Sequence, residues 1–214
     1  MNDRANFEDR RLSLRPLSGV EVTEDYLPLR LATLHGEMQW GKQATASTSD
    51  LRDSFDDVSL HFGVYFNTRI LAAVRLIMAD RPADLPSGRY FPKAFDGSGR
   101  VAEISKAMVD PVARQCGLFT ALLLECKARA YANGIADLFI SVVDTDRIRR
   151  FLNVEGFQEI GTPFHFEDQT ISVQDQAILL WNRFNTVESI ETISTRQDHI
   201  LSKAQSTLEP RVDS

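Results

Sequence analysis

Glu103 is a carboxylate whose position in the sequence suits acid–base chemistry. It lies in the apolar segment VAEISKAMV, over 101–109, whose alternation predicts a strand with Glu103, Ser105 and Ala107 on one face. A carboxylate in such surroundings must be paired, or its pKa rises. A raised pKa suits a general base that deprotonates an attacking amine, directly or through water. The structural alternative is a salt bridge to another strand residue or to Arg75, a cation inside the apolar run ILAAVRLI.

A turn that could bind a phosphate group follows this strand. The segment VDPVARQCGLF, over 109–119, places Gly117 where the next helix begins and Arg114 just before it. The first N–H groups of a helix have no internal partners, the helix dipole adds positive potential, and glycine lets a ligand approach the backbone. Together these features could cradle a pyrophosphate or the phosphate of phosphopantetheine. The structural alternative is an ordinary tight turn with glycine at a helix start.

Two aspartates, Asp53 and Asp56, lie in a long polar segment over 41–57 that is predicted to be a loop. They could hold a cationic substrate, or they could order the loop through Arg30 or Arg75. A solvated acidic turn is the remaining alternative. Arg75 needs a carboxylate partner in its predicted buried strand, and this aspartate pair would supply one.

Alternating strands and helices must position these residues. The strand over 101–109, an amphipathic helix over 118–131 and a mostly apolar strand over 136–143 imply a parallel crossover at the centre of a sheet. The outer hairpins imply antiparallel edges, so the predicted fold class is α/β with a mixed sheet. Trp40 follows the first helix, where it either walls a pocket or seals the core. The other predicted strands lie over 11–17, 61–66, 70–77, 164–168 and 173–181, with one more opening at Gly156, and the other predicted helices lie over 23–38, 145–155 and 185–208.

Composition and charge exclude several functional classes. The chain of 214 residues has a formal net charge of −6, which argues against nucleic-acid binding. No apolar run approaches the roughly 20 residues that span a bilayer, and the N-terminus lacks the apolar region of a secretory signal. Cys116 and Cys126 would be about 15 Å apart on one helix, so we expect reduced thiols in a cytoplasmic protein. The histidines show no metal-ligand spacing, so no metal is expected.

These segments together resemble the core of the GNAT acyltransferase superfamily. That family carries the pattern R/Q-x-x-G-x-G/A after a strand, and later a helix that ends before Gly-Phe. Arg114 and Gly117 match the first pattern, and Gly156-Phe157 matches the second. Phe119 departs from the small last residue of the first pattern, and Leu152 stands where many members have a tyrosine general acid.

Residues 11–182 are further similar to one branch of that superfamily, the acyl-homoserine lactone (autoinducer) synthases and the N-acyl amino acid synthases. Autoinducer synthases have Arg and Trp ten residues apart, a D-x-x-D motif, an R-L-L strand and an E-x-S-R motif. Lys106 stands where the last motif has arginine. The matching residues are Arg30, Trp40, Asp53, Asp56, Arg75 and Glu103.

The resemblance implies a GNAT-like, mostly antiparallel central sheet flanked by helices, with a parallel β-α-β crossover at the donor site. It implies a single acyltransferase domain over 1–184, followed by a C-terminal helix and frayed tail over 185–214. The implied reaction moves an acyl group from a thioester of acyl carrier protein (ACP) or coenzyme A to the amine of an amino acid or amino-acid derivative. The implied chemistry needs no metal.

The resemblance also implies roles for residues of this chain. Glu103 would orient or deprotonate the amine with Ser105 beside it, and main-chain donors around Val109 would hold the thioester carbonyl. Phe139 and Phe151 would line an acyl tunnel. The phosphopantetheine arm is expected at Arg114, Gln115, Cys116, Gly117, Leu118 and Phe119, and the amine substrate at Arg30, Trp40, Asp53, Asp56, Arg75 and Lys106.

Two other functions remain open. One is a small-molecule N-acetyltransferase that uses acetyl-CoA, and the other is a non-catalytic acyl-binding or CoA-binding sensor of the same fold. The expected partners are a small-molecule amine and, as a candidate, ACP. Because ACP and this chain are both acidic, docking would need a local basic patch, for which Arg147, Arg149 and Arg150 are candidates. The helix over 185–208 either packs on its own domain or forms a homodimer contact.

Overall fold

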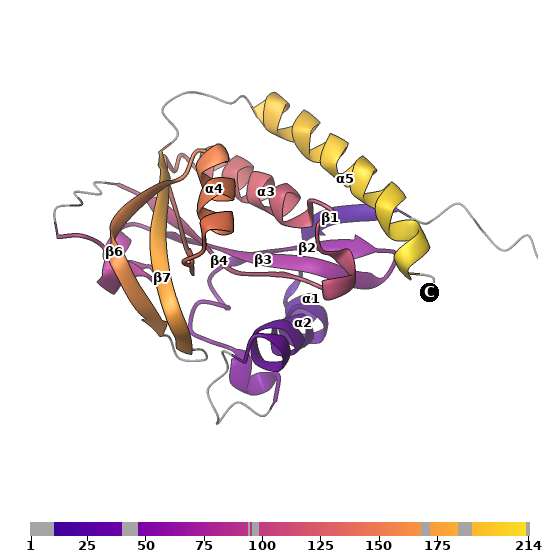
Figure 1. The fold of residues 1–214 in the computed structure, drawn as a ribbon, viewed down its shortest axis with the longest axis horizontal. Coiled ribbons are helices and arrows are strands. Elements are labelled where there is room, and N and C mark those ends of the chain that lie inside the picture. The colour runs from indigo at the N-terminus through magenta and orange to yellow at the C-terminus, as the bar shows by residue number, and fades with distance from the viewer. Residues whose placement is uncertain are drawn as a thin grey trace, which may run out of the picture.

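A seven-stranded mixed sheet forms the centre of the computed structural model (Figure 1). Its strands are β1 (Leu12–Pro16), β2 (Leu60–Phe66), β3 (Arg69–Ala79), β4 (Val101–Val109), β5 (Asp137–Val143), β6 (Gln158–Glu167) and β7 (Ser172–Arg183). The order is β1-β2-β3-β4-β5-β7-β6, and all neighbours are antiparallel except β4 and β5. This confirms the predicted α/β fold with its parallel crossover. The structure describes residues 11–39, 47–93, 95, 99–167, 172–183 and 190–212.

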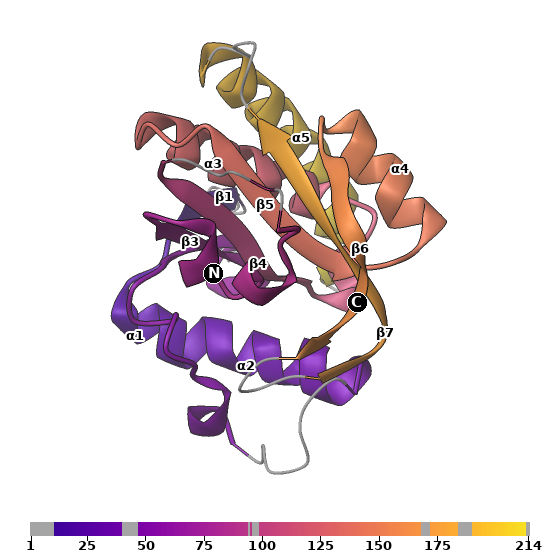
Figure 2. The same cartoon turned by 90° about the vertical axis from the view of Figure 1, so that its left-hand side faces the viewer.

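Helices cover both faces of this sheet. α3 (Leu118–Ala132), α4 (Asp146–Val154) and α5 (Ile190–Val212) lie on one face, and a helical segment over 19–37, here called the N-terminal helix, lies on the other (Figure 1). Figure 2 shows the same layers from the side, with β6 and β7 curving toward the N-terminal helix. The N-terminal helix consists of α1 (Gly19–Glu21), α2 (Leu27–Arg30) and π-helical turns over Val22–Tyr26 and Leu31–Glu37. Short 3-10 turns lie at Ser49–Leu51, Pro82–Asp84, Gly88–Tyr90 and Pro111–Ala113.

The N-terminal helix begins at Gly19, so the predicted start at residue 23 is wrong. Ser18 and Glu21 form a capping box, in which the Ser18 N–H donates to the Glu21 carboxylate at 2.8 Å and the Glu21 N–H donates to Ser18 Oγ at 3.3 Å. These two bonds satisfy backbone donors that a helix start otherwise leaves free. Pro28 lies at the beginning of α2, and the helix continues past it.

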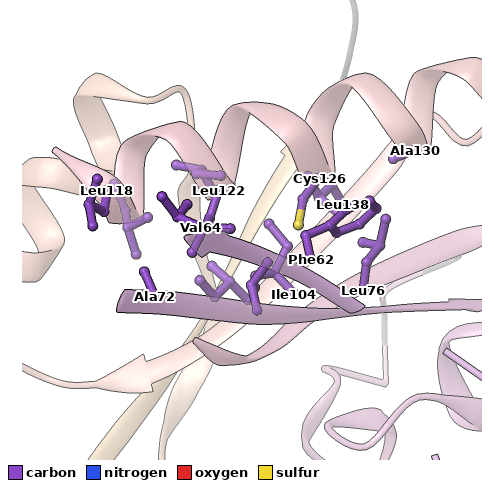
Figure 3. Close-up of a cluster of buried hydrophobic side chains, with 14 of the residues drawn as sticks. Phe62, Val64, Ala72, Leu76, Ile104, Leu118, Leu122, Cys126, Ala130 and Leu138 are labelled. Atoms are coloured by element: carbon purple, nitrogen blue, oxygen red, sulfur yellow. The ribbon is translucent and has the colours of Figure 1, made fainter. Parts of the chain in front are cut away.

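The main core cluster lies between the sheet and α3. Leu118, Leu122 and Cys126 of α3 pack over strand residues that include Phe62 (Figure 3). Burial raises the pKa of the Cys126 thiol far above its ordinary value, so this cysteine acts as a small apolar core residue. Cys126 and Cys116 form no disulfide in the described part of the chain, and their redox state stays a prediction.

α5 packs on the body of the protein. Gln197 donates from Nε2 to the carbonyl of Ala121 in α3 at 3.1 Å, and the N–H of Leu12 in β1 donates to Gln205 Oε1 at 3.3 Å. Leu208 belongs to the main core cluster. The homodimer contact and the domain boundary at residue 184 stay predictions. Among the described helices, α5 included, none combines the length and apolar character needed to cross a membrane.

β6 is one strand where the sequence predicts two. Its register with β7 shifts between Ile160 and Phe164, and Gly161 within this stretch has a φ of +78°. A left-handed residue interrupts the alternation of side chains along a strand. The apolar pattern in the sequence is therefore broken inside β6, and it predicts two short strands in place of one.

Gly117 at the start of α3 has two reasons to be glycine, and this yields a stability prediction. Its φ is +85°, and a Cβ there would lie 3.0 Å from Ile200 Cγ2 of α5. Gly134 has a φ of +69° with open space around it. We expect Gly134→Ala to lower the free energy of unfolding by about 1–2 kcal/mol through backbone strain, and Gly117→Ala to lower it further, as measured by urea denaturation. Adding Ile200→Ala to each glycine variant should reduce the difference between them, whereas an unchanged difference would show that the α5 contact does not matter.

Candidate active site

β4 and β5 separate halfway along β4. They pair from Val101 with Asp137 up to Ile104 with Ile140. Beyond that point β4 follows β3 and β5 follows β7, and the wedge between them opens into a cavity of about 720 Å³. The beginnings of α3 and α4 and the end of the N-terminal helix contribute to the lining. The crossover therefore opens a site of a size that suits a small-molecule ligand.

β4 carries a β-bulge where it borders the cavity. Arg75 of β3 pairs with Ser105, but Ala73 pairs with Met108, so β4 has one more residue than β3 between these two pairs. Lys106, in this interval, has a φ of +50°, which is uncommon outside glycine. Lys106 and Ser105 both line the cavity.

The bulge reverses the alternation of side chains in the second half of β4. Ala107 packs against the core cluster under α3, and Met108 packs in the cluster under the N-terminal helix. The prediction that Ala107 shares a face with Glu103 and Ser105 is therefore wrong, because one extra residue shifts the side-chain pattern by one position.

Glu103 is fully buried. One of its two carboxylate oxygens is held by the loop just before the 3-10 turn Gly88–Tyr90. Ser87 donates to Glu103 Oε2 from its N–H at 3.0 Å and from its hydroxyl at 2.7 Å. Glu103 lines the cavity, and its Oε1 has no hydrogen-bond partner within the described residues. Burial raises the pKa of Glu103 to about 7, although the bonds from Ser87 and the charges of Arg75 and Lys106 oppose the shift. Glu103 thus has a pKa that suits a base near neutral pH.

Arg75 lies at the floor of the cavity and binds the two aspartates rather than Glu103. Its Nη1 donates to Asp53 Oδ1 at 2.5 Å and to Asp56 Oδ1 at 2.6 Å, and its Nε donates to Ser105 Oγ at 3.0 Å. Arg30 of α2 binds the other oxygens of the pair, Asp56 at 3.1 Å and Asp53 at 3.3 Å. We call these two arginines and two aspartates the buried ion cluster.

The buried ion cluster favours the interpretation that the aspartates order their loop. Arg75 lines the cavity, but Arg30, Asp53 and Asp56 lie behind its wall. Burial opposes ionisation of Asp56, yet the hydrogen bond from His61 and the charges of Arg75 and Arg30 hold its pKa well below the ordinary value. Direct contact of the substrate with Arg30, Asp53 or Asp56 stays a prediction. Trp40, the other residue expected there, lies outside the described residues.

The predicted donor turn borders the cavity. Val109, Arg114, Gln115, Gly117, Leu118 and Phe119 all line it, and Cys116 is the one member of the expected set that does not. Asp110 Oδ1 accepts the Val112 N–H at 3.0 Å and so stabilises the turn. Gln115 has a φ of +64°. The turn leads directly into the first turn of α3, whose Gly117 provides no side-chain cap. The first backbone N–H groups of α3 therefore belong to residues that line the cavity and have no capping side chain.

Arg114 forms an ion pair with Glu37, which is not among the site residues expected from the sequence. Its Nη1 and Nη2 each donate to Glu37, at the end of the N-terminal helix, at 2.5 Å, and its Nε donates to the Val109 carbonyl at 3.3 Å. Both side chains are more than a third exposed. This ion pair joins the N-terminal helix to the donor turn at the rim of the cavity.

The rest of the cavity wall is mainly apolar. Phe119 of α3 and Phe151 of α4 lie with their ring centres 5.5 Å apart, and Phe166 and Val173 contribute from the tip of β6 and β7. Phe139, which was expected beside Phe151, is wrong as a cavity residue, because it is fully buried in a separate aromatic cluster. The apolar lining residues include Leu118, Phe119, Ile140, Val142, Val143, Ile148, Phe151, Phe166, Val173 and Ala177.

Besides Glu37, three polar residues of the site are not among those expected from the sequence. Ser87 holds Glu103, Ser141 of β5 lines the wedge, and Thr33 of the N-terminal helix lines the opposite wall. Thr33 could have been recognised from the sequence, because it is a polar residue on the apolar face of the predicted first helix. Ser87 and Ser141 could not have been recognised from the sequence, since their neighbours in space are distant along the chain.

The buried ion cluster yields a second prediction. Asp56→Asn keeps the shape of the side chain but leaves two buried arginines short of one negative charge, so we expect a loss of about 3–5 kcal/mol in the free energy of unfolding. Asp57→Asn is the matched control, because Asp57 lies next in the chain and pairs with Arg52 at an exposed position. Thermal unfolding should separate the two variants clearly. Equal melting temperatures would mean that the cluster does not hold the fold together.

A family model described as the N-acyl amino acid synthase FeeM matches residues 40–181 of this chain. No curated protein sequence matches this chain. The solved structure of FeeM, an N-acyl amino acid synthase from uncultured soil microbes, is similar with a TM-score of 0.62 at 16% identity, covering 86% of this chain and 94% of FeeM.

Other solved structures share the fold. A GNAT family acetyltransferase from Elizabethkingia anophelis with acetyl-CoA bound has a TM-score of 0.51 at 16% identity, covering 81% of this chain and 99% of that one. An acyl-CoA N-acyltransferase from Pseudomonas aeruginosa has a TM-score of 0.55 at 15% identity, with coverages of 80% and 97%. The family match spans most of the chain, and the fold agrees with it. The chain therefore belongs to the family of the N-acyl amino acid synthase FeeM and is an acyltransferase with the GNAT fold.

Proposed function

We propose that this acyltransferase moves a long acyl chain from a phosphopantetheine thioester, carried by ACP or CoA, to the amine of an amino acid or amino-acid derivative. The observation that carries the proposal is the carboxylate of Glu103 at the wedge between β4 and β5. It is fully buried, it has a pKa of about 7, and its Oε1 has no partner within the described residues. A base of this kind can take a proton from an amine close to neutral pH.

The open edge of β4 supplies a place for the thioester. Beyond Ile104 this edge is not paired with β5 among the described residues, so N–H groups around Val109 are candidates to hold the carbonyl oxygen. Glu103 accepts a proton from the acceptor ammonium, and the amine nitrogen then bonds to the carbonyl carbon. The carbonyl oxygen gains negative charge and then re-forms the double bond as the C–S bond breaks. The proton held by Glu103 passes to the leaving thiolate, and the nitrogen releases its second proton to solvent. An amide and a free thiol result.

The shape of the lining supports an acyl donor longer than acetyl. The donor turn would hold the phosphopantetheine arm at Arg114 and Gly117, next to the start of α3. From there the walls made by Phe119, Phe151 and Phe166 are apolar, and apolar surface of this extent favours a hydrocarbon chain. An acetyl group would leave most of this wall uncovered.

The basic patch on α4 that could contact ACP has fewer uncompensated charges than the three arginines at 147, 149 and 150 suggest. Arg149 binds Asp144 at 2.7 Å and also pairs with Glu159, so its charge is compensated. Arg147 and Arg150 are exposed, and Arg147 lines the cavity where α4 begins. We therefore assign any ACP contact on this helix to Arg147 and Arg150.

Glu103→Gln provides the test of the proposed base. We expect kcat/KM to fall by about 10²–10⁴-fold, with Glu24→Gln, at an exposed position, close to the unmodified protein. In the unmodified protein kcat/KM should rise with pH through about 7 as Glu103 ionises, and the residual activity of Glu103→Gln should lack that rise. A Glu103→Gln variant with full activity would remove Glu103 from the mechanism.

The same pKa shift provides a folding control. The folded protein holds the Glu103 proton more tightly than the unfolded chain, so the stability contributed by this group is present below pH about 4.5 and is lost as the pH rises through about 7. Glu103→Gln lacks this loss. We therefore expect the stability of the variant, relative to the unmodified protein, to improve between pH 5 and 8 in urea denaturation, so that an activity loss at pH 8 is not due to unfolding.

A donor series tests the substrate class. Acetyl, octanoyl and palmitoyl thioesters should each be offered on CoA and on ACP, with a mixture of L-amino acids as acceptors and mass spectrometry of the products. We expect the longer chains to react faster than acetyl on at least one carrier. Turnover of acetyl-CoA alone would contradict the long-chain proposal and favour the acetyltransferase alternative. Binding of donors without any product would favour the sensor alternative.

A further inference from the structure

The carboxylate of Glu103 is oriented through one of its two oxygens. Ser87 donates to Oε2 from its N–H at 3.0 Å and from its hydroxyl at 2.7 Å. The last torsion of a glutamate side chain has no sharp minimum of its own, so two bonds that converge on one oxygen decide where the other one points. Oε1 is left without a hydrogen-bond partner within the described residues, and Glu103 lines the cavity. Ser87 therefore sets the direction in which Glu103 can take a proton.

Ser87 is itself held in a closed turn. Ser87 is fully buried, and the Tyr90 N–H donates to its carbonyl at 2.8 Å. The Gly88 N–H donates to the carbonyl of Leu85 at 2.9 Å, and Leu85 is buried in the same cluster as Phe139. Ser87 and Tyr90 are thus the two ends of one turn, so a displacement of Tyr90 also moves the residue that holds Glu103.

The Tyr90 end of this turn is attached to a strand that contributes to the cavity wall. The Tyr90 hydroxyl donates to the carbonyl of His165 at 3.0 Å and accepts the N–H of Glu167 at 3.2 Å. The Tyr90 ring stacks on Phe164, with ring centres 3.9 Å apart. Phe166 lies on the same stretch of β6 and lines the cavity. One turn therefore connects the apolar wall at the tip of β6 with the carboxylate in β4.

We infer that Ser87 and Tyr90 are positioning residues of the acyl transfer: Ser87 turns Oε1 of Glu103 toward the acceptor amine, and Tyr90 fixes Ser87 from the cavity wall. This inference rests on the proposed function, because it needs Glu103 as the base. Neither Ser87 nor Tyr90 is among the residues that line the cavity. Both therefore act through Glu103 and not on the substrate.

The hydroxyl of Ser87 also influences the pH at which Glu103 is ionised. Burial raises the pKa of Glu103 to about 7, and the two bonds from Ser87 oppose that shift because they favour the ionised form. The charges of Arg75 on β3 and Lys106 on β4 act in the same direction as Ser87. Loss of the hydroxyl alone therefore raises the pKa of Glu103 further, while both charges stay in place.

Ser87→Ala tests this role through the pH profile of kcat/KM. The variant keeps the N–H bond and loses the hydroxyl bond, so we expect the midpoint of the rise with pH to move upward by about one unit. At pH 6 kcat/KM should be about tenfold below that of the unmodified protein, and it should recover above pH 9, with KM for the donor unchanged. Ser18→Ala is the matched control, because it removes a hydroxyl bond of 2.9 Å to the Glu21 carboxylate at an exposed helix cap. It should lower the stability without moving the midpoint.

The outcomes separate this inference from the proposed function. An unmoved midpoint in Ser87→Ala, together with loss of the pH-dependent rise in Glu103→Gln, would overturn the inference and leave the proposed function intact. Impairment of Ser87→Ala by the same factor at every pH would mean a structural role alone and would also overturn it. If Glu103→Gln keeps full activity and the rise with pH, Glu103 is not the base and both proposals fail.

Tyr90→Phe tests the connection to β6. The variant keeps the stacked ring and loses both hydroxyl bonds, so we expect kcat to fall about fivefold with KM for the donor unchanged. In a Ser87→Ala background the same change should have a smaller effect, because one of the two bonds that transmit it is already absent. Tyr131→Phe, at an exposed position of α3, is the control and should leave kcat unchanged. Equal losses from Tyr90→Phe in both backgrounds would show that Tyr90 does not act through Ser87.

Discussion

The guanidinium of Arg75 is the group on which the rest of the site depends. It joins the loop after the N-terminal helix to the middle of the sheet, through bonds to Asp53, Asp56 and Ser105. A charge fully buried in a strand is costly unless it is paired, so the loop must fold back over β3. That requirement brings the N-terminal helix, through Arg30, onto the same aspartates. The floor of the cavity is therefore a consequence of neutralising one buried cation.

The wall of the cavity follows from two departures from regular sheet structure. β4 leaves β5 after Ile104, and it bulges at Lys106. The first departure exposes backbone donors on one edge of β4. The second turns the strand so that Ser105 and Lys106 both border the open space. Together they place a buried base, a backbone edge and a cation along a few residues of one strand.

Much of the fold could be predicted because each element has a local pattern. The alternation around Glu103 and the apolar helix after Gly117 are visible without any knowledge of what they contact. The bulge at Lys106 is not, because an extra residue in one strand shows itself only against its neighbour. Ser87 could not be assigned to Glu103 for the same reason, since the contact joins a loop without periodicity to a strand far along the chain.

The candidate site was predicted best where a residue is unusual in its own segment. Glu103 and Arg75 stand out as charges in apolar strands, and both line the cavity. The sequence offers either the substrate or the arginines as partners of Asp53 and Asp56, and the structure joins them to the arginines. Their polar loop could not decide this, because a carboxylate that binds a substrate and one that binds an arginine look alike in a sequence.

The ion pairs that hold the N-terminal helix differ in strength between the floor and the rim of the cavity. At the floor, the N-terminal helix is tied by buried ion pairs that water and salt do not reach. At the rim, it is tied by Arg114 and Glu37, whose exposed pair is weak and screened by salt. The N-terminal helix is therefore held more firmly at the floor of the cavity than at its rim. A rise in ionic strength weakens the exposed pair at the rim and leaves the buried pairs at the floor largely unscreened.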